Sequence, residues 1–412
     1  MKSNRRLYYF TNNYPYGFGE SWKTNELTEL VRYFEKIDLI PFAYPYSGNK
    51  NAINPIEGVH YHLPLLSDGV SEKPILSKFF DVIISPNSFY FIKEFLKNKL
   101  FLSKKKTIRW ICASHKALQL KNSSELIKLV QNAPQDSIFY FFWGRETAEV
   151  LPLINFSKRI KKVVKFHGYD LYREVNDGYL PYQDRIMDSI DIGLSCSQSG
   201  LNTLCGYYPH YINKLFLQRI GIAAGAVSTA SNDGTFRILT CSRVIKLKRL
   251  HLIPQILKCL DVNILWTHIG DGPDFNDVIK TAENIEKSNI SISFMGHMTA
   301  NQVAEYYANH SVDLFLNVSE SEGVPVSIME ALAANIPVMA TNVGGTAEII
   351  DNKVGFLIDK NFEPEFVSNM ILDFINKTDA EKNIYRTNAF SRYKEMCKVE
   401  NLTENLTKFL IN

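Results

Sequence analysis

Residues 319–350 read SESEGVPVSIMEALAANIPVMATNVGGTAEII, and this segment decides the fold. Its nonpolar residues between Val326 and Ala333 predict a helix, and Pro325 suits the first position of that helix. The run 336–340 predicts a short buried strand that continues into a second loop and helix. The segment therefore contains two strand–loop–helix units in series, and doubly wound parallel sheets bind ligands at such strand ends.

Two glutamates of this segment favour a ligand site. Glu330 lies among nonpolar residues of the predicted helix, where an unpaired carboxylate is costly to bury. Glu322 precedes Gly323 in the loop before the helix, and the open N–H groups of a first helical turn attract phosphate. A ligand with a diphosphate in the middle and hydroxyl groups at both ends, as in a nucleotide-sugar, would match this arrangement.

A plainer interpretation stays open for the two glutamates taken alone. Glu322 would then be a solvated loop residue, and Glu330 a partly buried ion-pair partner. The adjacent Gly344 and Gly345 after the second strand favour the ligand site, because paired glycines permit close approach of the backbone to a ligand.

At these residues the chain resembles the family 4 glycosyltransferases, which are retaining enzymes of the GT-B fold. The family pattern is two glutamates separated by seven residues, then a Pro-Val strand and a Gly-Gly-x-x-Glu loop. This chain has Glu322, Glu330, Pro337-Val338, Gly344-Gly345 and Glu348 in those places. The resemblance covers nearly all of residues 236–350.

The upstream segment 236–250, FRILTCSRVIKLKRL, is similar to the strand and basic loop of the same family. Arg243 and Lys248 take the places of the family's arginine and lysine, whereas Ser242 and Arg249 replace two glycines. A forked guanidinium and a mobile ammonium suit a diphosphate, although these two residues alone would fit a solvated basic loop equally well. Two further strand ends match, WTHIGDGP at 266–273 and ISFMGH at 292–297.

The resemblance implies an α/β protein of the GT-B class, with two Rossmann-like doubly wound domains facing each other across a cleft. It implies that Arg243 and Lys248 hold a diphosphate, that Glu330 binds ribose hydroxyls and that Glu322 holds sugar hydroxyls. The expected catalytic residues are Glu322, His167, Arg243 and Lys248. The expected donor-binding residues are Gly17, Gly19, Arg243, Lys248, Gly270, Gly296, His297, Glu322, Gly323, Val324, Pro325, Val326 and Glu330.

Two motifs in the first half bear on substrate binding. Residues 14–20, YPYGFGE, follow the first expected strand, so Gly17 and Gly19 could approach a donor phosphate or the acceptor, although lone glycine loops are usually turns. Residues 165–172, KFHGYDLY, place His167 at a strand end, where a histidine is more often structural. In the resembled family it contacts the donor sugar, and HGYDLY is similar to transferases that build bacterial surface polysaccharides.

At 412 residues the chain is expected to form two domains. We expect an acceptor-side domain at 1–221, a linker at 222–234, a nucleotide-sugar domain at 235–388 and a C-terminal helix at 389–412 that crosses back to the first domain. The first half alternates short apolar runs with longer stretches, which is typical of a parallel sheet. Its expected strands are 7–11, 37–43, 82–85, 138–142, 163–167 and 192–196.

Composition indicates a cytoplasmic protein. The six cysteines form no CxxC pair and read as reduced core residues. The apolar run 7–10 is too short for a signal peptide, and no apolar stretch approaches the roughly 18 residues of a transmembrane helix. A net charge of +3 without a recognition motif argues against nucleic acid as a partner.

Residues 89–110, FYFIKEFLKNKLFLSKKKTIRW, carry seven basic residues and one acidic residue, interleaved with aromatic side chains. This mixture suits the surface of an anionic bilayer. A core helix followed by a solvated lysine loop would fit equally well. The first interpretation predicts peripheral association with the inner face of the cell membrane, where a lipid-linked acceptor would lie.

The resemblance thus implies a retaining transferase that moves a sugar from a UDP- or GDP-sugar to a glycan or lipid-linked glycan, in the synthesis of a bacterial capsule, O-antigen or exopolysaccharide. No Asp-x-Asp motif is present, so neither a metal nor another cofactor is expected. Two alternatives stay open. One is a non-catalytic nucleotide-sugar or glycan-binding protein of the same fold, and the other is a different enzyme of that fold, such as a phosphorylase or an epimerase.

Overall fold

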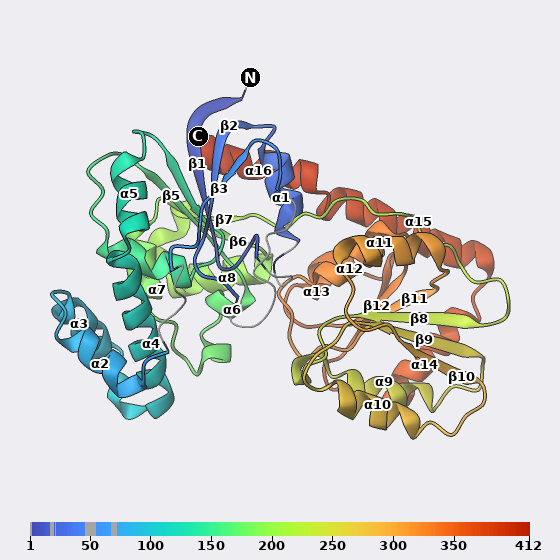
Figure 1. Ribbon diagram of the computed structural model, residues 1–412. Coiled ribbons are helices and arrows are strands. Elements are labelled where there is room, and N and C mark those ends of the chain that lie inside the picture. The colour runs from blue at the N-terminus through green and yellow to red at the C-terminus, as the bar shows by residue number, and fades with distance from the viewer. Residues whose placement is uncertain (1, 17–19, 21, 46–54, 67–71) are drawn as a thin grey trace. The chain divides into compact units, whose positions relative to one another are not determined.

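The computed structural model describes residues 2–16, 20, 22–45, 55–66 and 72–412, and it is shown in Figure 1. The chain forms two compact units. The first comprises Met1–Gln218 with Thr403–Asn412, and the second comprises Arg219–Leu402. The finer division of the chain at residues 221, 234 and 388 stays a prediction.

The described part of the first unit contains a seven-stranded parallel sheet with the order β3-β2-β1-β4-β5-β6-β7. Strand β1 pairs with β2 on one side and with β4 on the other, so the strand order reverses between β1 and β4. Strand β4 and the second half of β5 are buried on both faces, as expected for a parallel sheet covered by helices. The strands are β1 Ser3–Thr11, β2 Phe34–Pro41, β3 Val59–Tyr61, β4 Ile138–Phe141, β5 Lys161–Phe166, β6 Ile192–Ser195 and β7 Leu215–Leu217.

Helices and short 3-10 turns connect these strands. The helices are α1 Lys23–Leu30, α2 Ile75–Ile83, α3 Ser88–Lys97, α4 Lys104–Lys121, α5 Ser124–Asn132, α6 Gly168–Leu171, α7 Gln183–Ser189 and α8 Gln198–Tyr207. The 3-10 turns are η1 Leu100–Leu102, η2 Glu146–Leu153, η3 Glu174–Asn176 and η4 Pro209–Lys214.

Five of the six strands expected in the first half are confirmed, as β1, β2, β4, β5 and β6. The sixth, at residues 82–85, is wrong, because residues 82 and 83 end helix α2. Phe79, Val82 and Ile83 are spaced as on one face of a helix, and they belong to one apolar cluster with residues of α3 and α4. This spacing explains why the segment is helical. A short apolar run cannot by itself distinguish a strand from a buried helix face.

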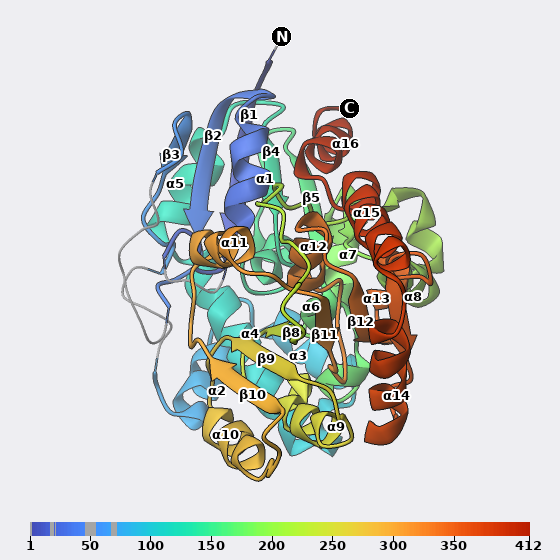
Figure 2. The same ribbon diagram turned by 90° about the vertical axis from the view of Figure 1, so that its right-hand side faces the viewer.

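One buried carboxylate joins α1 to the centre of the first sheet. Glu26 Oε1 accepts hydrogen bonds from Tyr9 Oη at 2.9 Å and Tyr140 Oη at 3.2 Å, and Glu26 Oε2 accepts from Lys165 Nζ at 3.1 Å. The three donors come from β1, β4 and β5, and the Lys165 side chain is fully buried. Figure 2 shows α1 along these strands. The glutamate therefore fixes the helix on three neighbouring strands at once.

The second unit contains, among described residues, a six-stranded parallel sheet with the order β10-β9-β8-β11-β12-β13. The strand order reverses between β8 and β11, which pair with each other. In doubly wound sheets this reversal opens a crevice at the carboxyl ends of the two strands. The strands are β8 Phe236–Cys241, β9 Ile264–Ile269, β10 Ile290–Phe294, β11 Leu314–Asn317, β12 Val338–Thr341 and β13 Gly355–Ile358.

The helices of this half are α9 Ile253–Leu257, α10 Phe275–Glu283, α11 Ala300–Asn309, α12 Val326–Ala333, α13 Thr346–Ile349, α14 Pro364–Ile375, α15 Asp379–Met396 and α16 Val399–Ile411, with 3-10 turns η5 Lys246–Lys248 and η6 Leu250–Leu252. The expected helical character of the C-terminal segment is confirmed. None of the helices in the described residues is both long enough and apolar enough to span a bilayer.

The Glu26 contacts generate a stability prediction. Glu26→Gln should lower the free energy of unfolding by about 3 kcal/mol, because it leaves the buried Lys165 ammonium facing a neutral amide. The second variant, Lys165→Met, should destabilise less in the Glu26→Gln background than in the wild type, since the two groups are coupled. Urea unfolding followed by circular dichroism measures both effects.

Glu35→Gln is the matched control, because Glu35 is exposed on the neighbouring strand β2. It should change the unfolding midpoint negligibly. Equal losses from the substitutions at Glu26 and Glu35 would contradict the anchoring role of Glu26.

Candidate functional site

The candidate site lies at the carboxyl ends of β8 and β11, where the second sheet reverses its strand order. The loop after β8 carries Arg243 and Lys248, and the loop after β11 carries Glu322. Helix α12 follows the second loop and begins at Val326, with Pro325 as its N-cap. The expected helix is therefore confirmed, and its start lies one residue later than expected.

An ion pair joins the two loops. Lys248 Nζ lies 2.6 Å from Glu322 Oε1, and Asn317 Nδ2 donates to the same oxygen at 3.3 Å. The Glu322 side chain is 8% exposed and that of Lys248 is 20% exposed, so solvent screens this pair weakly. The structure thus brings together two of the expected catalytic residues from loops 74 positions apart.

The paired glycines after β12 pack against the Glu322 loop. A Cβ added at Gly344, which has φ of 54°, would lie 1.7 Å from the carbonyl oxygen of Glu322. Gly345 N donates to the carbonyl oxygen of Gly323 at 2.7 Å, and a Cβ at Gly345 would lie 2.4 Å from that oxygen. The close approach that these glycines permit is therefore to the Glu322–Gly323 backbone, which they hold in place.

Arg249 stands where the resembled family has a glycine, and its backbone keeps a glycine-like conformation with φ of 48° and ψ of 32°. Its side chain takes over a structural role. Nε donates to Val318 O at 2.8 Å, and the two terminal nitrogens donate to Lys360 O at 2.8 Å and Ser319 O at 3.4 Å. Arg249 therefore ties the loops after β8, β11 and β13 together. Sequence reasoning noted the substitution but missed these contacts.

Arg243 differs from Lys248 in its surroundings. Its side chain is exposed, and it makes no hydrogen bond or ion pair with any residue that the structure describes. It lines an open hollow of about 510 Å³ with Asp271, Gly272 and Pro273 of the β9–α10 loop and with Phe275 and Asn276 at the start of α10. A guanidinium left without a partner beside an open hollow is available to an anionic ligand.

Glu330 lies within α12 and is only partly exposed. Burial raises the pKa of its carboxyl group to about 7. The charge of Glu330 in turn contributes to the raised pKa of the Cys241 thiol, at the end of β8, and of the Tyr307 hydroxyl, although burial is the largest cause for both. Glu330 makes no ion pair with any described residue, so the ion-pair interpretation of this glutamate is wrong.

The ends of β9 and β10 complete the edge of the sheet. Gly270 N donates to Gly296 O at 2.8 Å, and a Cβ at Gly270 would lie 1.9 Å from the carbonyl oxygen of Ser242. Gly296 has open space where a Cβ would lie. The exposed His297 has Nδ1 4.0 Å from Asp271 Oδ1. Gly270 therefore serves the packing of strand ends, whereas Gly296 and His297 face open space.

The first unit has its own polar cluster at strand ends. His167 follows β5 and is buried between aromatic rings, with ring centroids 4.3 Å from Trp143 and 4.8 Å from Phe142. Burial lowers the pKa of His167 and outweighs the effect of Asp170, whose Oδ2 lies 3.9 Å from Nδ1. Neither ring nitrogen makes a hydrogen bond to a described residue. A neutral histidine with two unused nitrogens suits a polar ligand.

Lys23 is a residue of this cluster that sequence reasoning missed. Its fully buried ammonium lies 2.5 Å from Glu20 Oε1, which also accepts a hydrogen bond from Trp143 Nε1 at 2.5 Å. Burial lowers the pKa of Lys23 to about 8, against the opposing effect of Glu20. No sequence motif distinguishes this lysine from a surface one. The expected site residues Gly17 and Gly19 lie outside the described residues.

One group of side chains in the described residues has the composition of a metal site. Asp38, His60 and His62 offer ligand atoms within 4.8 Å of one another. Arg6 already donates to both oxygens of Asp38, at 2.5 and 2.8 Å, and His62 Nε2 lies 2.8 Å from Oδ1. Burial alone would raise the pKa of Asp38, but these hydrogen bonds hold it at about 2. A metal would have to displace Arg6, so the residues fit an ion pair better.

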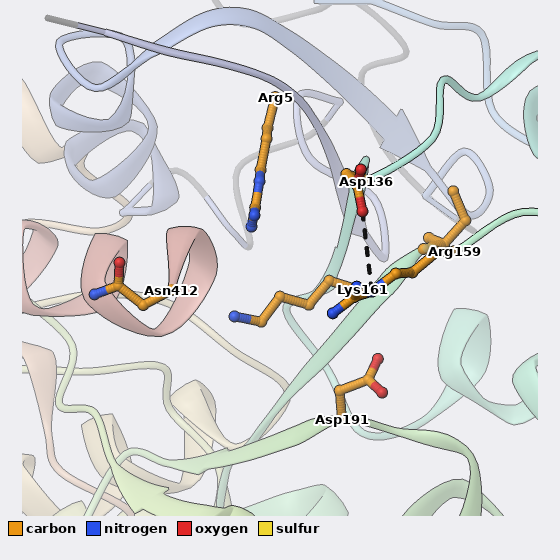
Figure 3. Close-up of a pocket in the computed structure, with 7 residues that line it drawn as sticks. Arg5, Asp136, Arg159, Lys161, Asp191 and Asn412 are labelled. Carbon is orange, nitrogen blue, oxygen red and sulfur yellow. Dashed lines mark ion pairs between the residues drawn. The ribbon is translucent and has the colours of Figure 1, made fainter.

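A separate pocket of about 190 Å³ is shown in Figure 3. Lys161 begins β5, Asp136 precedes β4 and Asp191 precedes β6, so the pocket lies at the amino ends of these strands. Doubly wound sheets bind their ligands at the carboxyl ends. This pocket is therefore distinct from the candidate site.

Residues 226–391 match the profile of the family described as "Glycosyl transferases group 1". The matched range contains the whole loop set described above for the second unit, from Arg243 to Glu348. The resemblance to this family is thereby confirmed for the second half of the chain.

Curated relatives match over parts of their length. Glycosyltransferase MJ1178 of Methanocaldococcus jannaschii is 33% identical over 158 residues, which are 37% of this chain and 42% of that protein. O-antigen biosynthesis glycosyltransferase WbnH of Escherichia coli is 27% identical over 171 residues, 36% of this chain and 48% of that protein. The aligned residues thus span less than half of these relatives.

Solved structures match over the whole chain. Anabaena Alr3699/HepE in complex with UDP and glucose has a TM-score of 0.66 at 15% identity, with 99% of each chain covered. The apo form of the lipopolysaccharide outer core galactosyltransferase WaaB has a TM-score of 0.65 at 13% identity, with 98% of each chain covered. The expected GT-B fold class, with two Rossmann-like α/β domains, is confirmed.

Glu330 generates a prediction of pH-dependent stability. In the folded protein its carboxyl keeps a proton up to about pH 7, whereas in the unfolded chain it loses the proton near pH 4.5. Stability therefore falls as pH rises between these two values. Glu330→Gln should remove this loss, raising the free energy of unfolding at pH 8 by at most about 3 kcal/mol and leaving it unchanged at pH 4.

Thermal unfolding at pH 4 and pH 8 checks the expectation. Glu322→Gln is the control, because the Glu322 carboxylate pairs with Lys248. It should lower rather than raise stability at pH 8, since it leaves Lys248 without its anion. Identical behaviour of the two variants would refute the assignment of Glu330 as an unpaired buried acid.

Proposed function

We propose that the chain is a retaining glycosyltransferase, because residues 226–391 match the family of group 1 glycosyl transferases. It moves a sugar from a UDP- or GDP-sugar to a glycan or lipid-linked glycan. One observation carries this proposal most directly. At a single sheet reversal the second unit holds an arginine and a largely buried glutamate that pair with no described residue, together with the Lys248–Glu322 ion pair. Such a set of groups suits a ligand with a diphosphate between two hydroxyl-bearing ends.

In this proposal the donor diphosphate binds Arg243 and Lys248. Arg243 supplies a guanidinium that pairs with no described residue and lies beside an open hollow. When the donor binds, the Lys248 ammonium gives up part of its contact with Glu322 and contacts a phosphate oxygen instead. The Glu322 carboxylate then accepts hydrogen bonds from sugar hydroxyls. Further hydrogen bonds to these hydroxyls come from the backbone of Gly323, Val324, Pro325 and Val326.

Glu330 binds the ribose hydroxyls as a hydrogen-bond acceptor. The unfavourable burial that raises its pKa is relieved when two hydroxyl donors reach it. Gly296 and His297 line the same strand ends and face the base. This assignment accounts for a carboxyl group that has no structural partner.

The proposed reaction needs no proton donor from the protein at the leaving group. The acceptor hydroxyl oxygen attacks the anomeric carbon from the face on which the diphosphate departs, and the bond from that carbon to the diphosphate oxygen breaks. The departing oxygen takes the acceptor's proton. Negative charge grows on the diphosphate as this bond breaks, so Arg243 and Lys248 stabilise the transition state more than the ground state.

His167 serves the sugar from the first unit. It is neutral because burial lowers its pKa, so one ring nitrogen donates and the other accepts. Gly17 and Gly19 keep their proposed role at the acceptor or donor phosphate. Lys23 and Trp143, which share Glu20, support the aromatic wall around His167.

The proposed acceptor follows from the names of the relatives. WbnH is an O-antigen biosynthesis glycosyltransferase, and the Salmonella typhimurium relative WcaL, 25% identical over 210 residues, is a putative colanic acid biosynthesis glycosyltransferase. We assign this chain to the synthesis of a bacterial surface polysaccharide in the cytoplasm, at the inner face of the membrane.

A donor panel tests the proposed function. Incubated with UDP- and GDP-sugars in the presence of EDTA, the chain should release nucleoside diphosphate slowly as water replaces the acceptor. Glu330→Ala should weaken donor binding by tenfold or more, since hydrogen bonds to a charged group contribute about 1.5–3 kcal/mol each. Calorimetry measures binding, and nuclear magnetic resonance of the transferred sugar reports the anomeric configuration.

The outcomes separate the alternatives. Donor binding without any release would favour a non-catalytic nucleotide-sugar-binding protein. An inverted product would overturn the retaining assignment, and loss of turnover in EDTA would overturn metal independence. Unchanged donor binding by folded Glu330→Ala would remove the ribose assignment.

Arg243 yields a sharper prediction. Arg243→Gln should lower kcat by about 100-fold while changing donor affinity less, because the charge it stabilises grows in the transition state. It should leave the unfolding midpoint unchanged, because the side chain is exposed and unpartnered. Steady-state kinetics of donor turnover give both parameters.

Lys246→Gln is the matched control, since Lys246 is an exposed cation three residues along the same loop. It should keep wild-type turnover. A similar loss in both variants would show that Arg243 acts only through the net charge of the loop.

A further inference from the structure

The α2–α3 region exposes an unusual amount of apolar surface. Among the described residues, nine of the nineteen large apolar side chains that are exposed lie between positions 75 and 108. Single exposed apolar residues are ordinary, whereas a contiguous group marks an interaction surface. The nine are Ile75, Leu76, Phe80, Ile84, Phe89, Leu96, Phe101, Leu102 and Ile108.

These residues form stripes because the helices are apolar on two faces. One face of α2 and α3 belongs to an apolar cluster with Trp110 of α4 and with Tyr179 and Tyr182. On α2 the opposite stripe is Leu76, Phe80 and Ile84, at intervals of four residues, and these are 67%, 54% and 78% exposed. Phe89 on α3 is 79% exposed and Leu102 in η1 is 74% exposed. The core of the region is complete without them.

The predicted membrane segment 89–110 therefore needs correction. Phe91 and Trp110 are buried in the cluster, so they are unavailable to a membrane. Within the segment the exposed residues are Phe89, Leu96, Phe101, Leu102 and Ile108, and the α2 stripe outside it adds further apolar surface. The sequence prediction began at Phe89 and therefore left out α2, although only residues 84–87 separate α2 from α3.

The same region concentrates positive charge. Residues 73–110 contain nine lysine and arginine residues and two acids, whereas the rest of the chain has more acids than bases. Asp81 is paired with Lys73, and Glu94 is buried. Five of the nine cations make no ion pair with any described residue, namely Lys78, Lys93, Lys99, Lys104 and Lys106.

Helix stability does not explain these cations. Lys104, Lys105 and Lys106 fill the first turn of α4, where positive charge opposes the helix dipole. Their placement becomes more favourable when the region meets negative charge. Figures 1 and 2 show α2 and α3 beyond the end of the first sheet at which its strands terminate, on the side where His167 follows β5.

We propose that α2, α3 and η1 form a docking surface for an anionic lipid bilayer. Leu76, Phe80, Ile84, Phe89 and Leu102 enter the boundary between headgroups and acyl chains. The lysines around them bind lipid phosphates, which is the combination that holds interfacial helices on membranes. The docking itself rests on this surface alone, whereas its use in reaching a lipid-linked acceptor rests on the proposed transferase function.

Other occupants fit the surface less well. A second copy bound across a two-fold axis would place this cationic patch against itself. Nucleic acid would neutralise the lysines but leave the aliphatic stripe of α2 in water. An anionic bilayer covers both kinds of side chain at once.

Vesicle co-sedimentation without donor or acceptor tests the proposal. Wild type should bind vesicles of phosphatidylcholine with 30% phosphatidylglycerol at least tenfold more tightly than pure phosphatidylcholine. The apolar variant Phe80→Ser/Phe89→Ser/Leu102→Ser should lose at least tenfold in binding to the anionic vesicles. The charge variant Lys78→Gln/Lys93→Gln/Lys104→Gln should lose the preference for anionic lipid.

Matched controls come from the second unit. Phe366→Ser/Ile384→Ser removes exposed apolar side chains that are 57% and 60% exposed, and Lys258→Gln/Lys280→Gln/Lys382→Gln removes three lysines. Both controls should bind vesicles as the wild type does. Circular dichroism and donor hydrolysis in solution should be unchanged in every variant, so a failure of docking is distinguishable from a failure of the transferase function.

Three outcomes would overturn the proposal. They are equal binding to neutral and anionic vesicles, full binding by the folded apolar variant, and equal losses in the control variants. A lipid-free dimer of the wild type that the apolar variant dissolves would instead assign the surface to a second copy of the chain.

Discussion

The contact between the loops after β11 and β12 is the constraint on which the candidate site depends. Gly344 lies so close to the carbonyl oxygen of Glu322 that no side chain fits between them. This contact fixes the Glu322 backbone, and the Lys248 ion pair then fixes its side chain. Arg249 adds hydrogen bonds to the carbonyl oxygens of Val318 and Ser319 in the same loop. A site that binds hydroxyl groups and phosphates needs loops that are already held in place, because freely moving loops would weaken each contact with the ligand.

The buried ionisable groups of this chain differ in whether described residues satisfy their polar atoms. Glu26 is surrounded by donors from three strands, so its burial supports the fold of the first unit. Glu330 has no ion-pair partner among the described residues, and its raised pKa shows that burial disfavours its charged form. His167 is likewise buried, and no described residue makes a hydrogen bond to its ring nitrogens. Unsatisfied buried polar groups lower stability, and a bound ligand can satisfy them.

The first unit combines two surfaces of different chemistry. Its strand ends carry the aromatic and polar cluster around His167, and its α2–α3 region carries exposed apolar and basic side chains. If the acceptor is linked to a lipid, the first unit needs both surfaces. It has to bind the bilayer in order to reach the part of the acceptor that extends beyond the headgroups. This arrangement would let one domain hold the membrane while the other holds a soluble donor.

The sequence alone predicted the parallel sheets, helix α12 and the position of Glu330 in an apolar helix, because strand and helix periods and local motifs are short-range features. It misassigned residues 82–85 and could not show that Gly344 packs on Glu322, that Arg249 bridges three loops or that Lys23 is buried beside Glu20. Those contacts join residues distant in the chain. Only the tertiary structure decides them, since strand order determines which loops meet and which side chains lose water.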